Sequence, residues 1–308
     1  MTANPYDQAC RYLAKLEPAS FLAWLLGLAL TSFRFRRWLD ARRVRFPGEP
    51  DRTCDTVAFV EHVAAGQQPW AMPIEFQIEP DPDMFGRLLG YLGVLWLEER
   101  PSDTRGDRFC LGAVVVNLTG QGNSTREMNW PEAGVLTRLG VRERNLARED
   151  ARTTLDAIIA GTVPAIVLPF IPLMQRGGEA GIIADWVTRA SAEPDARRRA
   201  DLGGLALVFA EAAGCAEVWK KALEGWNVMQ SKQVLEWQEQ ASAKASAEAH
   251  ARDVLDVLQE RIGALPNAVI EQVCGVRDVA VLKRWLRLAA RATTLDQFLQ
   301  DSGVMNGK

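Results

Sequence analysis

The sequence predicts an α/β core followed by a mostly α-helical C-terminal half. The chain has 308 residues, of which 48% are hydrophobic, and this is enough to bury a sizeable core. Up to about residue 120, short β-rich segments bounded by turn residues alternate with segments of helical periodicity. From about residue 145 onward the pattern is mostly helical, except at 163–174, which we predict as a short strand with proline exits.

The N-terminal part is predicted to run helix, strand, strand, strand, helix, strand. Residues 5–30 show helical spacing of apolar side chains, and Pro18 is expected to divide this helix. Three β-rich segments follow, at 33–46, 54–63 and 70–78. The last two are joined by a turn around Gly66 and are therefore predicted to form a hairpin.

A helix and a strand complete this core. The stretch "EPDPDMFGRLLGYLGVLWLEE" begins with helix-start signals, because Asp81 can cap a helix and Pro82 suits its first position. Residues 108–120 then predict a buried strand that ends in a glycine loop. The helix also carries a stripe of small residues, which predicts a close approach to a sheet or to another helix. These residues are Gly86, Gly90 and Gly93.

The C-terminal half is expected to contain one long helix over 216–250 and a small helical module over 252–300. Three tryptophans lie near one face of the long helix, where they suit a core or an interface better than stacking on nucleobases. They are Trp219, Trp226 and Trp237. The sequence thus divides into a core domain at 1–175, a helical extension at 176–250 and a terminal module at 251–308.

Composition limits the class of protein. The net charge of -3 does not indicate a nucleic-acid binder by itself, and five cysteines without a C-x-x-C pair favour a reducing, cytoplasmic compartment. The two histidines, His62 and His250, are far apart in the sequence, which argues against a zinc site. The apolar run at 19–33 is too short to span a bilayer, and we expect a buried helix there and no association with a membrane.

The predicted hairpin carries polar side chains on one face. Residues i and i+2 of a strand share a face, so Glu75 and Gln77 point the same way. If the hairpin is centred near Gly66, the numbers of paired residues sum to about 132, which places Asp55 opposite Gln77 and diagonal to Glu75. Two carboxylates and an amide then converge on one patch of the sheet.

Such a patch suits a hard cation. Two carboxylates that face each other repel and raise a pKa unless a cation joins them. Oxygen ligands suit Mg²⁺, with Mn²⁺ as a substitute, and such an ion can activate water and neutralise charge that develops on a phosphodiester. The alternative reading of the same spacing is an ordinary solvated hairpin face.

These residues carry a family resemblance. The element order, with Asp55 followed by Glu75-Phe76-Gln77, resembles the PD-(D/E)XK nuclease core. More narrowly, "PIEFQIEPDPDMFGRLLGYL" resembles the recombination-promoting nuclease family, which is transposase-like. The shared features are a Glu-x-Gln strand, a nearby acid and a helix with methionine, "R-L-L" and tyrosine. The resemblance covers roughly residues 5–120, and the tail at 252–300 resembles a small helical domain of unknown function often joined to such nucleases in bacteria.

The resemblance implies a role for each site residue. Asp55 and Glu75 would bind the metal ion with help from the backbone carbonyl of Phe76. Gln77 stands where the general pattern has lysine, and it would orient the attacking water without supplying lysine's positive charge. Many such cores also have an acid on the first helix, for which Asp7 and Glu17 are both candidates.

Further residues could support this site. Arg87 lies one turn before Tyr91 and would contact either a phosphate or Glu75, although a structural ion pair is the alternative. The acids Glu79, Asp81 and Asp83 could be extra metal ligands, although helix capping explains Asp81 and Asp83. An arginine cluster could bind phosphates or could be a solvated surface. Its members are Arg34, Arg36, Arg37, Arg42, Arg43 and Arg45.

The sequence therefore leads to the hypothesis of a bacterial, Mg²⁺-dependent DNA endonuclease linked to recombination or mobile elements. Its catalytic residues would be Asp55, Glu75, Gln77 and Arg87, and its helical C-terminal half would serve dimerisation, DNA clamping or partner binding. The alternative is a catalytically inactive protein that uses the nuclease fold to bind protein or nucleic acid. In that case the long helix and the terminal module would be the working parts.

Overall fold

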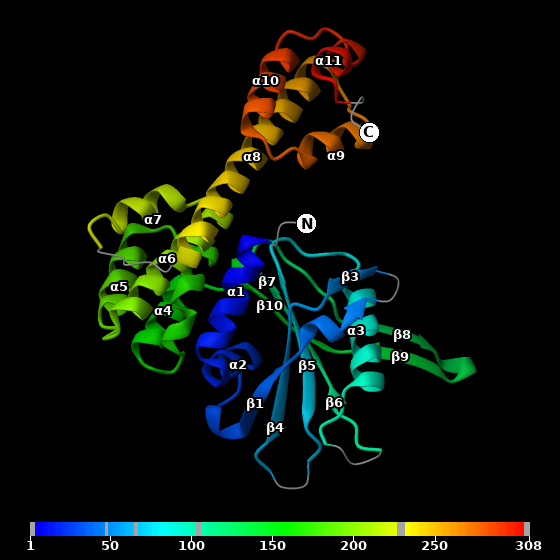
Figure 1. Cartoon of the computed structure of the whole chain (residues 1–308), viewed down its shortest axis with the longest axis vertical. Coiled ribbons are helices and arrows are strands. Elements are labelled where there is room, and N and C mark those ends of the chain that lie inside the picture. Colours follow the sequence, from blue (N-terminus) through cyan, green and yellow to red (C-terminus); the bar gives the residue numbers. More distant parts are fainter. Residues whose placement is uncertain (1–3, 47–48, 65–66, 103–105, 227–231, 305–308) are drawn as a thin grey trace. The chain divides into compact units, whose positions relative to one another are not determined.

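The structure is a computed structural model, and it describes residues 4–46, 49–64, 67–102, 106–226 and 232–304. Within these residues the chain forms two compact units, Met1–Trp237 and Gln238–Lys308. Figure 1 shows that the first unit contains the β-sheets and the second is helical. The sequence led us to expect three parts. The structure instead divides once, and the division falls inside helix α8 (Lys232–Ile262).

A mixed sheet forms the centre of the first unit, in the strand order β1-β4-β5-β7-β10. Neighbouring strands are antiparallel from β1 to β5 and parallel from β5 to β10. The predicted order of helix, strand, strand, strand, helix, strand is confirmed, because α3 connects β5 to the parallel strand β7. The strands are β1 (Phe33–Leu39), β4 (Thr56–His62), β5 (Trp70–Gln77), β7 (Ala113–Asn117) and β10 (Val141–Asn145).

Shorter strands lie beside this sheet. β6 (Cys110–Leu111) pairs with the beginning of β5, so the predicted strand at 108–120 is interrupted at Gly112. Two small antiparallel pairs are separate from the main sheet. They are β2 (Arg45–Phe46) with β3 (Glu49–Thr53), and β8 (Arg126–Trp130) with β9 (Val135–Leu139). Gly66, the expected centre of the hairpin turn, lies outside the described residues.

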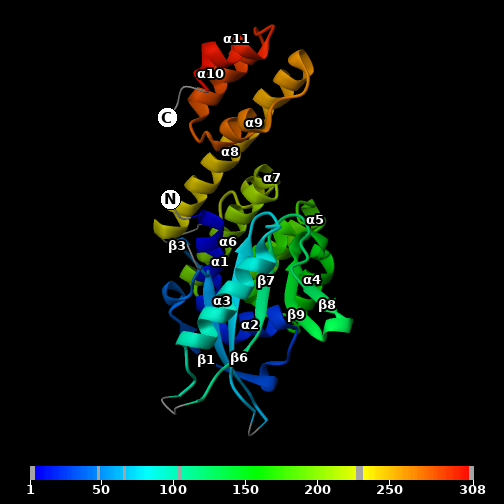
Figure 2. The ribbon, with the colours of Figure 1, turned by 90° about the vertical axis from the view of Figure 1, so that its right-hand side faces the viewer.

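Helices cover both faces of the main sheet (Figure 1). α1 (Pro5–Leu16) and α2 (Pro18–Leu26) lie on one face, and Pro18 divides them as predicted. On this side the ring of Phe21 packs 6.2 Å from that of Phe76. Figure 2 shows α3 (Met84–Glu98) in front of the opposite face. There α3 contributes Tyr91 to a core of side chains that point away from Phe76 along β4, β5 and β7.

The start and the packing of α3 differ from the prediction. The helix begins at Met84, so Pro82 is not its first residue, and Asp81 accepts a hydrogen bond from the N–H of Asp83 in a turn before the helix. A Cβ added to Gly86 or Gly93 would meet no atom within 4 Å. The expected close approach at these glycines is therefore wrong, because they lie on the solvent side of α3.

The segment 163–174 is helical, and its prediction as a strand is wrong. It forms the 3₁₀ helix η5 (Ala165–Leu173), with side chains buried from Ile166 onward. Pro169 and Pro172 lack the N–H group that a central strand needs, while a short 3₁₀ segment can accommodate them. The other helices of this region are α4 (Ala151–Ile159), α5 (Ala180–Ser191) and α6 (Ala196–Ala212).

The single long helix predicted at 216–250 is also wrong. α7 (Ala216–Ala222) ends before Gly225, which adopts a left-handed φ of 76°. α8 begins at Lys232 and continues through Ile262. The tryptophans of this region are core residues, since the Trp219 and Trp226 rings lie 5.1 and 5.3 Å from the ring of Trp186.

The second unit confirms the predicted helical module. The C-terminal part of α8 packs with three further helices around a core that includes Val254, Leu282 and Phe298. These helices are α9 (Asn267–Gly275), α10 (Val279–Ala289) and α11 (Leu295–Ser302). Short 3₁₀ helices elsewhere in the chain are η1 (Leu30–Ser32), η2 (Ala41–Arg43), η3 (Pro131–Ala133) and η4 (Leu146–Arg148).

Candidate functional site

The register of the β4–β5 hairpin brings the two predicted carboxylates together. Thr56 pairs with Ile74, so the numbers of paired residues sum to 130, and the expected sum of 132 is wrong. Because the difference is even, the same side chains still share a face of the sheet. Asp55, directly before β4, consequently lies beside Glu75 instead of opposite Gln77.

Backbone hydrogen bonds hold this carboxylate pair in place. The N–H of Asp55 donates to Oε1 of Glu75 over 3.0 Å, and the N–H of Phe76 donates to Oδ2 of Asp55 over 2.8 Å. Each carboxylate thus binds the backbone of the neighbouring strand. The backbone at the start of β4 and the end of β5 therefore orients both carboxylates.

Two arginines from different helices bind the remaining carboxylate oxygens. Nη2 of Arg87, on α3, lies 2.7 Å from Oε2 of Glu75, while its Nη1 lies 2.8 Å from Oδ2 of Asp81. Arg11, on α1, forms an ion pair with Oδ1 of Asp55. The sequence analysis expected Arg87 to contact either a phosphate or Glu75, and the structure places it against Glu75. It missed the contact of Arg11 with Asp55.

Burial governs the electrostatics of this pair. Glu75 is 2% exposed, and desolvation together with the charge of Asp55 raises its pKa to about 8, against the opposing effect of Arg87. The hydroxyl of Tyr91 lies 3.4 Å from Nη2 of Arg87, and burial followed by the charge of Glu75 raises its pKa to about 12. Burial therefore favours the protonated form of Glu75, and the positive charge of Arg87 opposes this effect.

Gln77 presents an unpaired donor next to the carboxylates. Its Oε1 accepts a hydrogen bond from the N–H of Asp81 over 3.0 Å. Its Nε2 is buried and has no hydrogen-bond partner among the described residues. Buried amide groups are normally satisfied, so this N–H₂ group is available to a water molecule or a ligand.

Asn117 is a second polar residue of this region that the sequence analysis missed. It pairs with Gln77 across the parallel strands β5 and β7, so the two side chains lie on the same face. Its Nδ2 donates to Oε1 of Glu143 and to Oδ1 of Asn145, each over 2.8 Å, while its Oδ1 is buried without a partner. The only sequence signal was an asparagine at the end of an otherwise apolar strand.

The site opens into a pocket of about 290 Å³. Asp7 of α1 joins its lining, whereas Glu17 forms an ion pair with Arg198 on α6. Of the two candidate acids near the first helix, the structure thus brings only Asp7 to the pocket. The remaining lining residues are Asn4, Asp55, Glu75, Phe76, Gln77, Ile78, Glu79, Asp81 and Arg87.

The predicted phosphate-binding arginines do not converge on this pocket. Arg34 on β1 pairs with Glu61 on β4. Glu61 lies six residues along the strand from Asp55, which corresponds to roughly 20 Å. Three members have ion pairs of their own, Arg36 with Glu61, Arg42 with Asp40 and Arg43 with Glu99. Arg37 lies over the ring of Phe59, and the side chain of Arg45 is outside the described residues.

The carboxylate pair is the candidate donor set for a hard divalent cation. Among the described residues, no group of three or more His, Cys, Asp and Glu side chains is arranged to hold a metal ion. Mg²⁺ needs fewer protein ligands than that, because it keeps several waters and shares substrate phosphate oxygens with one or two carboxylates. Asp55 and Glu75 offer two such carboxylates, whose oxygens are paired in this structure with Arg11, Arg87 and two backbone N–H groups.

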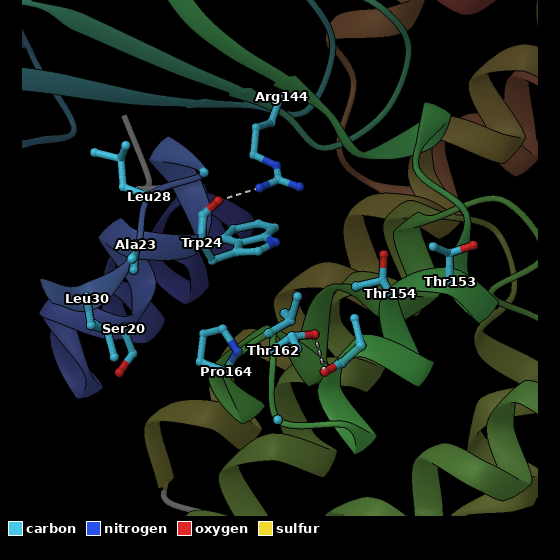
Figure 3. A pocket seen from close by; sticks show the side chains of 15 residues that line it. Ser20, Ala23, Trp24, Leu28, Leu30, Arg144, Thr153, Thr154, Thr162 and Pro164 are labelled. Atoms are coloured by element: carbon cyan, nitrogen blue, oxygen red, sulfur yellow. Dashed lines mark hydrogen bonds between the residues drawn. The ribbon is translucent and has the colours of Figure 1, made fainter. Parts of the chain in front are cut away.

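A larger pocket of about 590 Å³ lies elsewhere in the first unit (Figure 3). Its main charged group is Arg144, whose guanidinium lies 4.2 Å from the centre of the Trp24 ring. The polar atoms of Arg144 already bind both carboxylate oxygens of Glu149 and the carbonyl oxygen of Trp24. This arginine therefore strengthens the contact between β10 and α2 and is not free to bind an anion.

Comparison with known proteins does not add to this picture. No family model, no curated protein and no solved structure matches the chain. Among the residues that the structure describes, every helix is too short or too polar to cross a lipid bilayer. The functional argument consequently depends on the geometry of the site.

Proposed function

We propose that the protein is a metal-dependent endonuclease of the PD-(D/E)XK type that hydrolyses phosphodiester bonds in DNA, with a role in recombination or mobile elements. One observation carries the proposal: Asp55, directly before β4, meets Glu75, near the end of β5, next to the buried Nε2 of Gln77, which has no partner among the described residues. The order of helices and strands around this hairpin supports it. A cytoplasmic location suits the five cysteines, all of which are free.

Asp55 and Glu75 would hold Mg²⁺ or Mn²⁺ together with the backbone carbonyl of Phe76. The ion would activate a water molecule and neutralise charge on the phosphate that is attacked. Gln77 would orient the water through Nε2, which has no other partner among the described residues. Its Oε1 is held by the N–H of Asp81, so the amide is oriented before substrate binds.

The two arginines have a positioning role in this proposal. Arg87 binds both Glu75 and Asp81, and therefore fixes the carboxylate against the start of α3. Arg11 does the same for Asp55 from α1 and is 38% exposed at its side chain, which leaves it able to reach a phosphate oxygen. Each arginine forms an ion pair with one carboxylate, and Arg87 opposes the rise that burial causes in the pKa of Glu75.

A second candidate function is that of an inactive nuclease fold that binds protein or nucleic acid. The observation that favours it is the same pair of arginines, because they already neutralise the two carboxylates without a metal ion. In this case the second unit would carry the function. A homodimer formed through the C-terminal helices remains a prediction under either candidate.

The proposal is tested by cleavage of an end-labelled linear DNA duplex in the presence of Mg²⁺, Mn²⁺ or EDTA. We expect cleavage with either metal and none with EDTA, and we expect Asp55→Asn and Glu75→Ala to lose it. Arg176→Gln is a matched control, since Arg176 pairs with Glu179 at an exposed position away from the pocket. Absence of cleavage by the unmodified protein with both metals would favour the inactive fold.

A further inference from the structure

The helix α10 in the second unit has one face fixed in a core. Leu282, Trp285 and Ala289 are buried on this face. Nε1 of Trp285 donates to the carbonyl oxygen of Ser302 over 3.2 Å, and its ring packs edge-on against Phe298 of α11. These contacts determine which side of α10 faces outward.

The outward side carries a row of cations, which we call the α10 cationic face. It consists of Lys283, Arg284 and Arg287 on α10 and of Arg291 in the turn after the helix, and all four are exposed. Within the described part of the chain, none of the four forms an ion pair, unlike Arg277, which lies 3.7 Å from Glu248. Among the described residues, the face thus has no ion-pair partner.

Helix stability does not explain this arrangement. Lys283 and Arg287 lie at positions i and i+4 of the helix, and like charges at this spacing destabilise a helix. A cation in the last turn favours the negative end of the helix dipole, which accounts for Arg287. The same effect does not reach Lys283 and Arg284, which lie further from the end of the helix. The row of cations as a whole therefore lowers the stability of the isolated protein.

We propose that the α10 cationic face binds the phosphate backbone of duplex nucleic acid. Three of its four members are arginines, whose planar guanidinium groups match phosphate oxygens. Lys283 and Arg287 lie about 6 Å apart along the axis at the rise of an α-helix, and Arg291 extends the row into the turn that follows. The helical part of the row thus spans about two phosphate intervals of one strand, which are about 3.4 Å each along the duplex axis.

The structure favours nucleic acid over an anionic membrane as the partner. Helices that lie on a membrane surface insert an apolar face between the lipids. The apolar face of α10 is instead occupied by contacts with Phe298 and the rest of the core. The cationic face offers charge alone, which suits a phosphate backbone. This inference goes beyond cleavage and does not depend on an active nuclease site.

The test is binding of the full chain to a fluorescent 30-base-pair duplex, measured by anisotropy in EDTA so that cleavage plays no part. The variant replaces all four cations with glutamine (K283Q, R284Q, R287Q and R291Q). Loss of four phosphate contacts should reduce the slope of log K against log salt by up to about four, at about 0.9 per contact. The unmodified protein should thus lose on the order of a hundredfold more affinity than the variant between 50 and 200 mM salt.

A matched control removes the same number of positive charges from the first unit, through R138Q, R152Q, R176Q and K220Q. Each of these side chains already has an ion-pair partner. Circular dichroism verifies that both variants fold. The proposal is overturned if the control weakens binding as much as the α10 variant does. It is also overturned if the unmodified protein binds phosphatidylserine vesicles through these residues and does not bind the duplex.

Discussion

Glu75 is the residue whose environment most distinguishes this site. It is almost completely buried, it lies beside Asp55, and it receives hydrogen bonds from a backbone N–H and from Arg87. Buried carboxylates of this kind are uncommon outside functional sites, because burial without a function only costs stability. Glu75 and its neighbour Gln77 therefore give two predictions, one about ionisation and one about catalysis.

The first prediction concerns the pH dependence of stability. Because the pKa of Glu75 is raised from 4.5 to about 8 by folding, the native state keeps a proton that the unfolded chain releases within this range. The free energy of unfolding should therefore fall as pH rises from about 5 to 8, by up to about 1.4 kcal/mol per pH unit from this residue. Urea unfolding at several pH values should show a shallower fall for Glu75→Gln. Equal slopes for the two proteins would contradict the assignment.

The second prediction concerns Gln77. Removal of its unpaired Nε2 in Gln77→Ala should lower the cleavage rate by about 10²- to 10³-fold, as for other single donors in active sites. Binding of Mn²⁺ should change little, because the carboxylates remain. Gln67→Ala, at the exposed start of the same hairpin segment, is the control and should cleave normally. A variant of Gln77 with normal cleavage would remove this residue from the proposed mechanism.

At the residue scale, sequence reasoning found the polar strand face but not its partners. The alternation along β5 sufficed to place Glu75 and Gln77 on one side, and that part is local. Arg11 could not be found in this way, because its contact with Asp55 joins residues 44 apart in the sequence. Asn117 was missed for a related reason: its proximity to Gln77 depends on the parallel pairing of β5 with β7.

At the scale of elements, α3 shows how a sequence pattern can be misread. Its glycines suggest close packing, yet the buried stripe of the helix consists of larger side chains such as Leu88, Tyr91 and Leu95. Exposed glycines in a helix lower its stability without a compensating contact. This reading makes a prediction that does not depend on function.

Gly86→Ala and Gly93→Ala should each stabilise the protein by about 0.5–1 kcal/mol, because alanine favours the helix and meets no neighbour. Gly122→Ala is the contrasting variant. Its added Cβ would lie 2.5 Å from Oε1 of Glu143 and 2.7 Å from Nδ2 of Asn117, so it should destabilise the protein. Urea midpoints report all three. Destabilisation by the α3 variants would indicate a contact that the monomer does not contain.

The elements that could be predicted were those with a clear period and clear boundaries. The strands and the helix between 33 and 120 meet both conditions, and their order was confirmed. The apolar run at 163–174 has no periodicity that distinguishes a strand from a buried helix. Its prolines disfavour a central strand, and the segment forms a 3₁₀ helix. The break near Gly225 was missed because the tryptophan spacing on either side continued the helical pattern.

At the scale of the whole molecule, the chain contains two units with separate cores. The core of the second unit is built from its own residues alone, from Ala247 to Val304. Phe298→Ala should therefore lower the stability of that unit by about 3–5 kcal/mol. Hydrogen exchange should show lost protection in α9, α10 and α11 and unchanged protection in β4, β5 and β7. Equal loss in both units would show that they unfold together.

The account as a whole depends on the Asp55–Glu75 pair being a metal site. The most direct measurement is a calorimetric titration of the full chain with Mn²⁺, in parallel with Glu75→Ala and Asp55→Asn. We predict saturable binding by the unmodified protein, with release of a proton below about pH 8 as Glu75 ionises, and no binding by either variant. Absence of binding by the unmodified protein, or binding that both variants retain, would contradict the proposed site and with it the proposed nuclease.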